Sequence, residues 1–201
     1  MIDLPETDKI RLQESNAALK RALMIDNISD TLIPAWVDDT LTPVEKLLVH
    51  QRGLRHLAVS VFLLSGPDVL IQRRALGKYH TPGLWANTCC THPHWGEDPM
   101  TCAHRRLEQE MGIVDVTLLH RDVIEYRADV GSGLIEHEVV DLFVAHVDRG
   151  IELSPNPNEV METNWISIDE LRGQAATMPH KFTPWLRIYL AQHADKIFLK
   201  P

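Results

Sequence analysis

The sequence predicts one domain of the α/β (α+β) class, in which strands and helices alternate along the chain. With 201 residues, the chain is long enough to bury a substantial core as a single domain. Alternating apolar residues predict strands at 56–64 and 134–147, and the stretch between them carries a helix pattern at 98–111. We find no internal repeat and no linker, so we expect a domain over residues 31–201 preceded by a helical extension over residues 1–30.

Composition excludes several classes of protein. Hydrophobic residues make up 44% and charged residues 24% of the chain, as in ordinary globular proteins. A net charge of −8 argues against a partner that is nucleic acid or an anionic membrane. No apolar run reaches the roughly 18 residues of a membrane span, and residues 1–12 lack a signal-peptide core. The three cysteines do not form a disulfide framework and predict a reduced, cytoplasmic compartment.

The first elements carry little chemistry. Residues 8–24 have a helical pattern, which fits a docking helix, an oligomerisation helix or a frayed terminus. A strand is expected at 31–37, at the edge of a sheet because Pro34 interrupts it. Ordered structure restarts after Pro43. A Gly-Pro-Asp turn at 66–68 then joins two strand patterns into a predicted hairpin.

The later elements follow from capping and turn signals. Asp98 and the proline after it mark the start of a helix that should end before Gly112. We expect an interrupted strand over 114–130 and a second strand after the turn at 131–133. Asp169 should cap a short helix, and the last helix should run from Thr183 to about Lys196.

The stretch 78–93 combines a cation, a rigid Pro-Gly turn, a thiol and an imidazole. If residues 87–92 are extended, Cys90 and His92 point to the same face and Cys89 to the opposite one. A proton-transferring thiol would then lie beside a candidate metal ligand. The alternative is that a buried cysteine and a surface histidine are merely neighbours in sequence.

A pair of carboxylates suggests a metal site. Glu136 and Glu138 share one face of an otherwise apolar strand, where unpaired buried charge is costly. A divalent cation would neutralise both, and His50, His56 and His92 offer imidazole ligands suited to Mn²⁺, Fe²⁺ or Zn²⁺. The alternative is a strip of glutamates that faces solvent.

Four cations indicate an anionic ligand if the fold brings them together. Lys46, Arg74, Lys78 and Arg106 suit point-charge or bidentate contact with phosphate, although each alone fits ordinary solvated charge. Glu110 shares a helix face with Arg106 and could hold Mg²⁺ bridged to phosphate oxygens.

Residues 91–113 resemble a degenerate Nudix box, the metal-binding loop and helix of the Nudix family. Two carboxylate positions of the box are changed, with Arg106 and Gln109 where the family has Glu. This loss speaks against ordinary Nudix pyrophosphate hydrolysis. The positions that resemble the box are Thr91 in place of its first Gly, Glu97, Arg105, Glu110, Gly112 and Ile113.

These departures resemble one branch, the type I isopentenyl-diphosphate isomerases, over residues 32–186. The motifs that carry the resemblance are Cys90–Pro93, Glu136–Glu138, Arg73–Lys78, Tyr126–Ala128, Glu159–Trp165 and the histidines His50 and His56. The resemblance implies a Nudix-type mixed-sheet sandwich flanked by helices. It also implies interconversion of isopentenyl and dimethylallyl diphosphate by a 1,3-proton shift through a tertiary carbocation, in isoprenoid precursor biosynthesis.

The resemblance further implies a role for each candidate residue. Cys90 and Glu138 would transfer protons, Tyr126 would hydrogen-bond Glu138, and Trp165 would stabilise the cation through its π face. The diphosphate would be bound by Lys46, Arg74, Lys78 and Arg106. One Mn²⁺, Mg²⁺ or Zn²⁺ would be bound by His50, His56, His92, Glu136 and Glu138, and Glu110 would help to hold a Mg²⁺ on the diphosphate.

Some alternatives stay open at this level. A Nudix-type diphosphate hydrolase or an inactive binding module of the same fold would use a similar scaffold. The expected partner is a small prenyl diphosphate, with neither nucleic acid nor membrane, and the chain could be a monomer or a homodimer.

Overall fold

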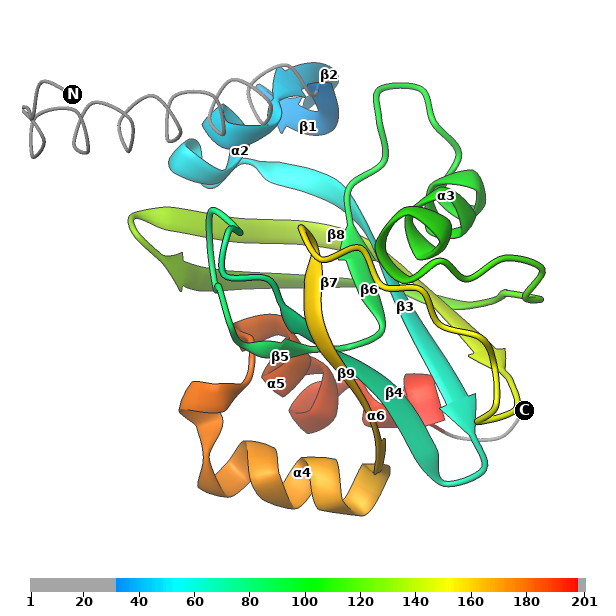
Figure 1. Cartoon of the computed structure of the whole chain (residues 1–201). Helices are drawn as coiled ribbons and strands as arrows, with labels where there is room; N and C mark the ends of the chain where they lie inside the picture. Colours follow the sequence, from blue (N-terminus) through cyan, green and yellow to red (C-terminus); the bar gives the residue numbers. More distant parts are fainter. Residues whose placement is uncertain (1–31, 199–201) are drawn as a thin grey trace, which may run out of the picture.

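The computed structural model describes residues 32–198, in which a mixed nine-stranded sheet is covered by helices (Figure 1). The helix expected at residues 8–24 lies outside the described residues. The strands are β1 (Leu32–Val37), β2 (Thr40–Glu45), β3 (Arg55–Ser65), β4 (Asp68–Arg74), β5 (Trp85–Ala86), β6 (Cys89–Thr91), β7 (Leu119–Gly131), β8 (Leu134–His146) and β9 (Val160–Ser167). The helices are α2 (Lys46–Arg52), α3 (Pro99–Met111), α4 (Ile168–Thr177), a 3₁₀ turn at Pro179–Lys181, α5 (Pro184–Gln192) and α6 (Ala194–Phe198).

Strand β3 is the centre of the sheet. Along one edge it pairs in parallel with β8 from Arg55 to Leu64, and β8 pairs in turn with β7. Its other edge is shared in succession by β1, β6 and β4. Both β6 and β8 therefore lie directly beside β3, on opposite edges of it, which brings residues 30 to 80 positions apart in sequence to one surface.

The two faces of the sheet pack against different helices. Phe62 and Leu64 of β3 belong to a core that includes side chains from α4, α5 and α6, whereas Val61 and Leu63 belong to a second core with α3. This alternation follows from the two-residue period of a strand. In Figure 1, α3 lies on one side of the sheet and α4 to α6 on the other.

The ends of helix α3 confirm the expected signals. The Asp98 carboxylate accepts a hydrogen bond from the backbone N–H of Thr101, and Gly112 adopts the left-handed conformation that ends the helix. A side chain at Gly112 would also collide with Ser154, because an added Cβ would lie 2.6 Å from its Cβ. The predicted β3–β4 hairpin and strand β8 are present as well.

Three details differ from the sequence expectations. Strand β1 is not at the edge, because β2 pairs with it along its whole length. The edge strand is β2, which also contains a proline, Pro43. The cap of α4 is Ser167, whose hydroxyl accepts from the backbone of Glu170, rather than Asp169. The expected last helix is broken at His193 into α5 and α6.

Candidate active site

A single face of four neighbouring strands supplies the candidate active site. Pairing places Cys90 of β6 opposite Ser60 of β3, and Glu138 of β8 opposite His56 of β3. Tyr126 of β7 lies opposite Glu138 in turn. Because His56 and Ser60 are four residues apart on one strand, their side chains share a face. The thiol and the carboxylate therefore lie on opposite sides of β3 but face the same pocket.

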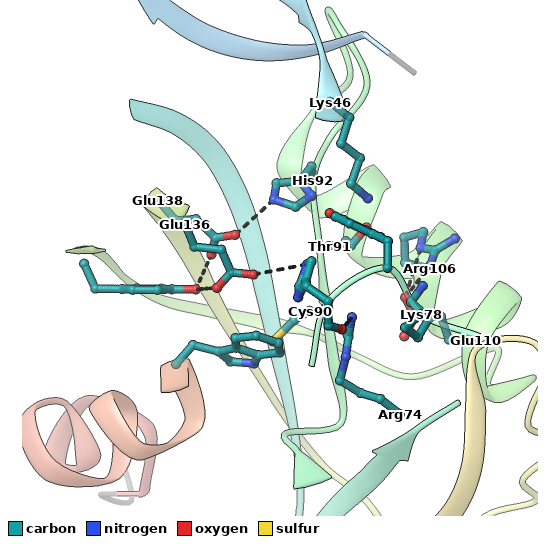
Figure 2. Close-up of a pocket in the computed structure, with 14 residues that line it drawn as sticks. Lys46, Arg74, Lys78, Cys90, Thr91, His92, Arg106, Glu110, Glu136 and Glu138 are labelled. Carbon is teal, nitrogen blue, oxygen red and sulfur yellow. Dashed lines mark hydrogen bonds and ion pairs between the residues drawn. The ribbon is translucent and has the colours of Figure 1, made fainter. Parts of the chain in front are cut away.

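The pocket gathers almost all the residues that the sequence suggested (Figure 2). Figure 2 shows Glu136 and Glu138 side by side, with His92 beside them and the cationic side chains across the pocket. The residues that line it are Lys46, Arg74, Lys78, Tyr79, His80, Cys90, Thr91, His92, Arg106, Glu110, Tyr126, Glu136, Glu138 and Trp185.

The two carboxylates are buried, so the solvent-facing alternative is wrong. Glu136 is 3% and Glu138 6% exposed. The Tyr126 hydroxyl lies 3.0 Å from Oε2 of Glu136 and 2.6 Å from Oε2 of Glu138, and it can donate to either. The other oxygen of Glu138, Oε1, lies 3.0 Å from Nε2 of His92 and 3.7 Å from Nε2 of His56. Each oxygen of Glu138 thus has a different set of partners.

Their pKa values are shifted in opposite directions. Burial, together with the adjacent Glu138 charge, raises the pKa of Glu136 well above its usual value. Burial opposes ionisation of Glu138 too, but its contacts with His56 and His92 hold its pKa well below the usual range. In the protein without a metal, ionisation of the pair is therefore favoured at Glu138 over Glu136.

His50 and His56 are not among the residues that line the pocket, but each has an unpartnered nitrogen close to His92 and Glu138. Their Nδ1 atoms each lie 2.7 Å from a backbone carbonyl, of Lys46 and Leu54 respectively. A carbonyl only accepts, so Nδ1 carries the proton and Nε2 is left with its lone pair. Both Nε2 atoms are buried with no hydrogen-bond partner among the described residues. Burial and the nearby His56 lower the pKa of His50 to about 3, which keeps that imidazole neutral and able to bind a metal.

The donor set fits a divalent cation. One ligand atom from each of His50, His56, His92 and Glu138 lies within 4.8 Å of the others. Buried imidazole lone pairs without a partner are costly, and a cation would satisfy them. Imidazole with carboxylate suits Mn²⁺, Fe²⁺ or Zn²⁺. Glu136 lies beside this group, held to it through their shared Tyr126.

Four cations converge on the opposite side of the pocket. Burial and the charges of Lys78 and Arg106 lower the pKa of Lys46 to about 8. Arg74 is buried, and its Nε has no hydrogen-bond partner among the described residues. Lys78 and Arg106 both form ion pairs with Glu159, at 2.5 and 3.4 Å. Mutual repulsion between these cations would be relieved by a bound polyanion.

Glu110 lies on the cationic side rather than among the histidines. Its carboxylate accepts from Arg106 on the preceding turn of α3 and from Gln72 of β4 at 3.0 Å. It is 4% exposed and lines the pocket, so it could share a cation with an anionic ligand. The hydrogen bonds from Arg106 and Gln72 replace those that water would make with the Glu110 carboxylate, which compensates for its burial.

The Cys90 thiol is held by hydrogen bonds at the floor of the pocket. It donates to the Asn87 side-chain oxygen at 2.8 Å and lies 3.2 Å from the Ser60 hydroxyl, which contacts Tyr189 at 2.7 Å. Burial raises its pKa above the ordinary value, so the thiol is the resting form. Cys89 packs in the opposite core, with α3, as its place on the strand predicts.

The structure does not bring Trp165 to the pocket. On β9 it pairs with Leu70 and packs in the core on the α3 side of the sheet, whereas the pocket opens on the other side. The indole that lines the pocket is Trp185, at the start of α5 and 1% exposed. This corrects the sequence-based placement of the aromatic residue. A Thr-Pro helix start just before Trp185 was visible in the sequence, but not the direction of its ring.

Sequence reasoning also missed other residues that line or support the site. His80 and Tyr79 lie in the stretch 78–93 and were given no role, and Glu159 was only part of a motif. Neither residue has a distinctive spacing in the sequence: His80 is an imidazole in a turn, and Ser60 is one hydroxyl on an apolar strand.

Comparison with known proteins identifies close relatives. A family model described as NUDIX domain matches residues 54–186. The isopentenyl-diphosphate Delta-isomerase of Dinoroseobacter shibae is 62% identical over 167 residues, which are 83% of this chain and 95% of that protein. The isopentenyl-diphosphate Delta-isomerase of Rhodobacter capsulatus is 60% identical over 171 residues, covering 85% and 97% of the two chains.

Solved structures with low sequence identity share the fold. The crystal structure of DR0079 from Deinococcus radiodurans aligns with a TM-score of 0.63 at 14% identity, covering 80% of this chain and 97% of that one. A MutT NUDIX hydrolase from Burkholderia pseudomallei aligns with a TM-score of 0.54 at 21% identity, covering 69% and 98%. The predicted mixed sheet with flanking helices is therefore confirmed.

Proposed function

This chain belongs to the isopentenyl-diphosphate Delta-isomerase family. We propose that its pocket performs the isomerisation by one proton transfer to the substrate and one proton transfer from it. The observation that carries the proposal is that a thiol, Cys90, and a carboxylate, Glu138, face one pocket from opposite sides of β3. The cations across that pocket supply a place for a diphosphate.

The reaction moves a double bond by one carbon. A proton is added to the terminal CH₂ carbon of isopentenyl diphosphate, and a tertiary carbocation forms on the next carbon. Loss of a proton from the CH₂ group that is bonded to this cationic carbon, on the side toward the diphosphate, then gives dimethylallyl diphosphate. One enzyme group gives a proton and another takes one, so the enzyme returns to its resting state by exchange with water.

Cys90 and Glu138 are the proposed pair. Each can exist with or without a proton, and they approach the substrate from opposite edges of β3. Oxygen Oε2 of Glu138 accepts from the Tyr126 hydroxyl, which would stabilise its anionic form and orient it.

The cationic side of the pocket is the proposed diphosphate site. Lys46, Arg74, Lys78 and Arg106 would contact its oxygens. Glu110, on the same side, would help to hold a Mg²⁺ that bridges phosphate oxygens. Binding would fix the hydrocarbon end of the substrate between thiol and carboxylate, which lowers the entropic part of the barrier.

The histidine side of the pocket is the proposed metal site. The ion, when bound, would supply positive charge that keeps the buried carboxylates anionic and organised. Its ligands would be His50, His56, His92, Glu136 and Glu138. The bound ion would hold Oε1 of Glu138, and Oε2 would stay directed toward Tyr126 and the substrate.

Trp185 is the proposed stabiliser of the carbocation. Its ring lines the pocket, and an indole face attracts a cation by about 2 kcal/mol or more when water is excluded. The buried surroundings of the pocket would also keep water from trapping the cation. The role that the resemblance implied for Trp165 is thus proposed for Trp185 instead.

The alternative of a Nudix-type diphosphate hydrolase has less support. Hydrolysis on this scaffold needs several metal-binding carboxylates on the helix of the box. Here Arg106 occupies one of those positions and forms ion pairs with Glu110 and Glu159, and Gln109 occupies another. These substitutions replace metal ligands with a cation and an amide, which suits holding a phosphate rather than cleaving it.

The function is tested by following the fate of the substrate. Purified protein is incubated with isopentenyl diphosphate and Mg²⁺, and the products are followed by ¹H and ³¹P NMR. We expect dimethylallyl diphosphate with both phosphates intact. Release of phosphate or pyrophosphate would support a hydrolase instead, and binding without any product would support an inactive module.

Three wider expectations remain proposals. The three cysteines are all free, which fits a reduced, cytoplasmic setting, and the described helices contain no span long and apolar enough to cross a membrane. We propose that residues 31–201 act as the isomerase domain, with residues 1–30 as an extension. The prenyl diphosphate is the expected partner, and a monomer and a homodimer both stay possible in this proposal.

A further inference from the structure

We propose that His80 is an additional protein ligand of the metal bound in this pocket. His80 lies between β4 and β5, in the turn that also carries Lys78, and its ring is 5% exposed. It faces the carboxylate pair: its Nε2 lies 3.6 Å from Oε1 of Glu136. This inference deepens the metal site of the proposed function and rests on that site's existence.

The ring of His80 is arranged as the rings of His50 and His56 are. Its Nδ1 lies 3.1 Å from the Thr81 hydroxyl oxygen, so the other nitrogen, Nε2, is directed into the pocket. Nδ1 of His50 and of His56 is likewise held by an oxygen, with Nε2 inward. A histidine that binds a metal through one ring nitrogen usually has its other ring nitrogen hydrogen-bonded to an oxygen in this way.

Three donor atoms form a second group that overlaps the first. Ligand atoms of His50, His80 and Glu136 lie within 4.8 Å of one another. His50 belongs to both groups, but its Nδ1 is engaged by a carbonyl and its Nε2 has one lone pair. Two ions therefore cannot both bind His50 at once. The six donors of the two groups do not all lie within 4.8 Å of one another, so a single ion would have to draw the two groups together. The shared His50 favours this one ion with an extended donor set over a second metal site.

The surrounding rings fix the direction of His80. Its ring stacks on that of His50 at 5.8 Å with an interplanar angle of 26°, and Tyr79 and Trp185 approach it edge-on at 4.3 and 5.8 Å. The Arg74 guanidinium donates to the His80 backbone oxygen at 3.2 Å. A ring held in this way cannot turn away from Glu136 without disturbing the phosphate-binding side of the pocket.

The chemical consequence is a preference among metals. Another imidazole favours Zn²⁺, Co²⁺ and Mn²⁺ over Mg²⁺, which prefers oxygen ligands and water. Loss of the His80 imidazole should therefore weaken the binding of Zn²⁺, Co²⁺ and Mn²⁺ more than the binding of Mg²⁺. The occupant is a divalent transition-metal ion, and Co²⁺ is the probe of choice because its spectrum reports its ligands.

The test compares Co²⁺ binding in three proteins without substrate. The full chain is stripped of metal, and Co²⁺ is titrated into wild type, His80→Asn and, as a matched control, His104→Asn, whose imidazole is exposed on α3. We expect one Co²⁺ per chain in each. The dissociation constant should rise about 10- to 100-fold for His80→Asn and not for His104→Asn, with a shift of the visible Co²⁺ bands only in the former.

A second measurement uses the wild type alone, so that misfolding of a variant cannot affect its result. Paramagnetic ¹H NMR of the Co²⁺-loaded protein counts strongly shifted imidazole N–H signals. Four signals, from His50, His56, His80 and His92, would support the proposal. Three signals, or equal dissociation constants and equal spectra in all three proteins, would overturn it. Because no substrate is present, this result is independent of whether the protein isomerises, and absence of Co²⁺ binding in wild type would instead remove the metal site itself.

Discussion

Replacing Trp185 by leucine tests how the pocket stabilises a carbocation. The indole ring lines the pocket, and a desolvated cation–π contact contributes about 2 kcal/mol. Losing it should lower kcat by about 30-fold. The loss should fall on kcat rather than KM, since only the transition state carries the charge. Arg74 lies over the Trp185 ring at 5.3 Å, so any change in diphosphate binding would appear separately in KM.

Two further variants make the test decisive. Trp185→Phe should retain most of the activity because a phenyl ring keeps a weaker π face. Trp165→Leu is the control: that indole packs on the other face of the sheet, so kcat should stay near the wild-type value while Tm falls. Rates are measured by NMR on protein shown to be folded by circular dichroism. If Trp185→Leu and Trp165→Leu lose kcat equally, or Trp185→Leu loses only Tm, the ring serves packing and the reasoning fails.

Further predictions concern the thiol, the metal and a supporting ion pair. Cys90→Ala should abolish isomerisation with fold and metal content intact, whereas Cys89→Ala, on the opposite face, should be mild; equal losses would identify the wrong thiol. His92→Asn should lose the tightly bound ion by elemental analysis, and full occupancy would remove His92 from the ligand set. Arg105 donates to Glu97 at 2.6 Å and holds its pKa below the ordinary 4.5. Glu97→Gln should therefore cost about 1.5–3 kcal/mol of unfolding free energy at neutral pH. This stabilisation is complete above pH 4.5 and is lost as pH falls through the lowered folded-state pKa, so the Tm difference from wild type should shrink in acid; a constant difference would contradict it.

Local signals accounted for many elements of the fold. Asp98 and Gly112 mark the ends of α3 because capping and left-handed conformations are encoded by single residues. The faces of Cys89, Cys90 and Glu138 followed from the period of a strand once the strand was recognised. Pairing partners did not follow, because β3 contacts β8 and β6 across long stretches of chain.

The aromatic residue of the site shows where sequence reasoning stopped. Trp165 and Trp185 are both tryptophans beside an element boundary, and nothing local says which face of the sheet each reaches. Periodicity gives a strand its two faces but not the pocket that one of them lines. The packing of α5 against β3 and β7 decides this, and that packing depends on contacts between distant parts of the chain.

Sequence reasoning also could not predict that four cationic side chains converge on one pocket. Lys46, Arg74, Lys78 and Arg106 come from α2, β4, the following turn and α3, and their spacing in sequence carries no periodicity. Only the resemblance to a family suggested that they act together. His80 went unassigned because an imidazole in a turn has no partner until Glu136 is brought across the sheet to face it.

The most direct test of the central claim is isomerisation in D₂O. Isopentenyl diphosphate is converted by wild type in the presence of Mg²⁺ in D₂O, and the dimethylallyl product is analysed by ²H NMR and mass spectrometry. If one protein group adds a proton and another removes one, a deuteron from the exchangeable groups must enter the new methyl carbon, and both phosphates must stay attached. Product that lacks deuterium would mean that hydrogen moved directly between the two carbons, without the thiol and the carboxylate, and would contradict the account.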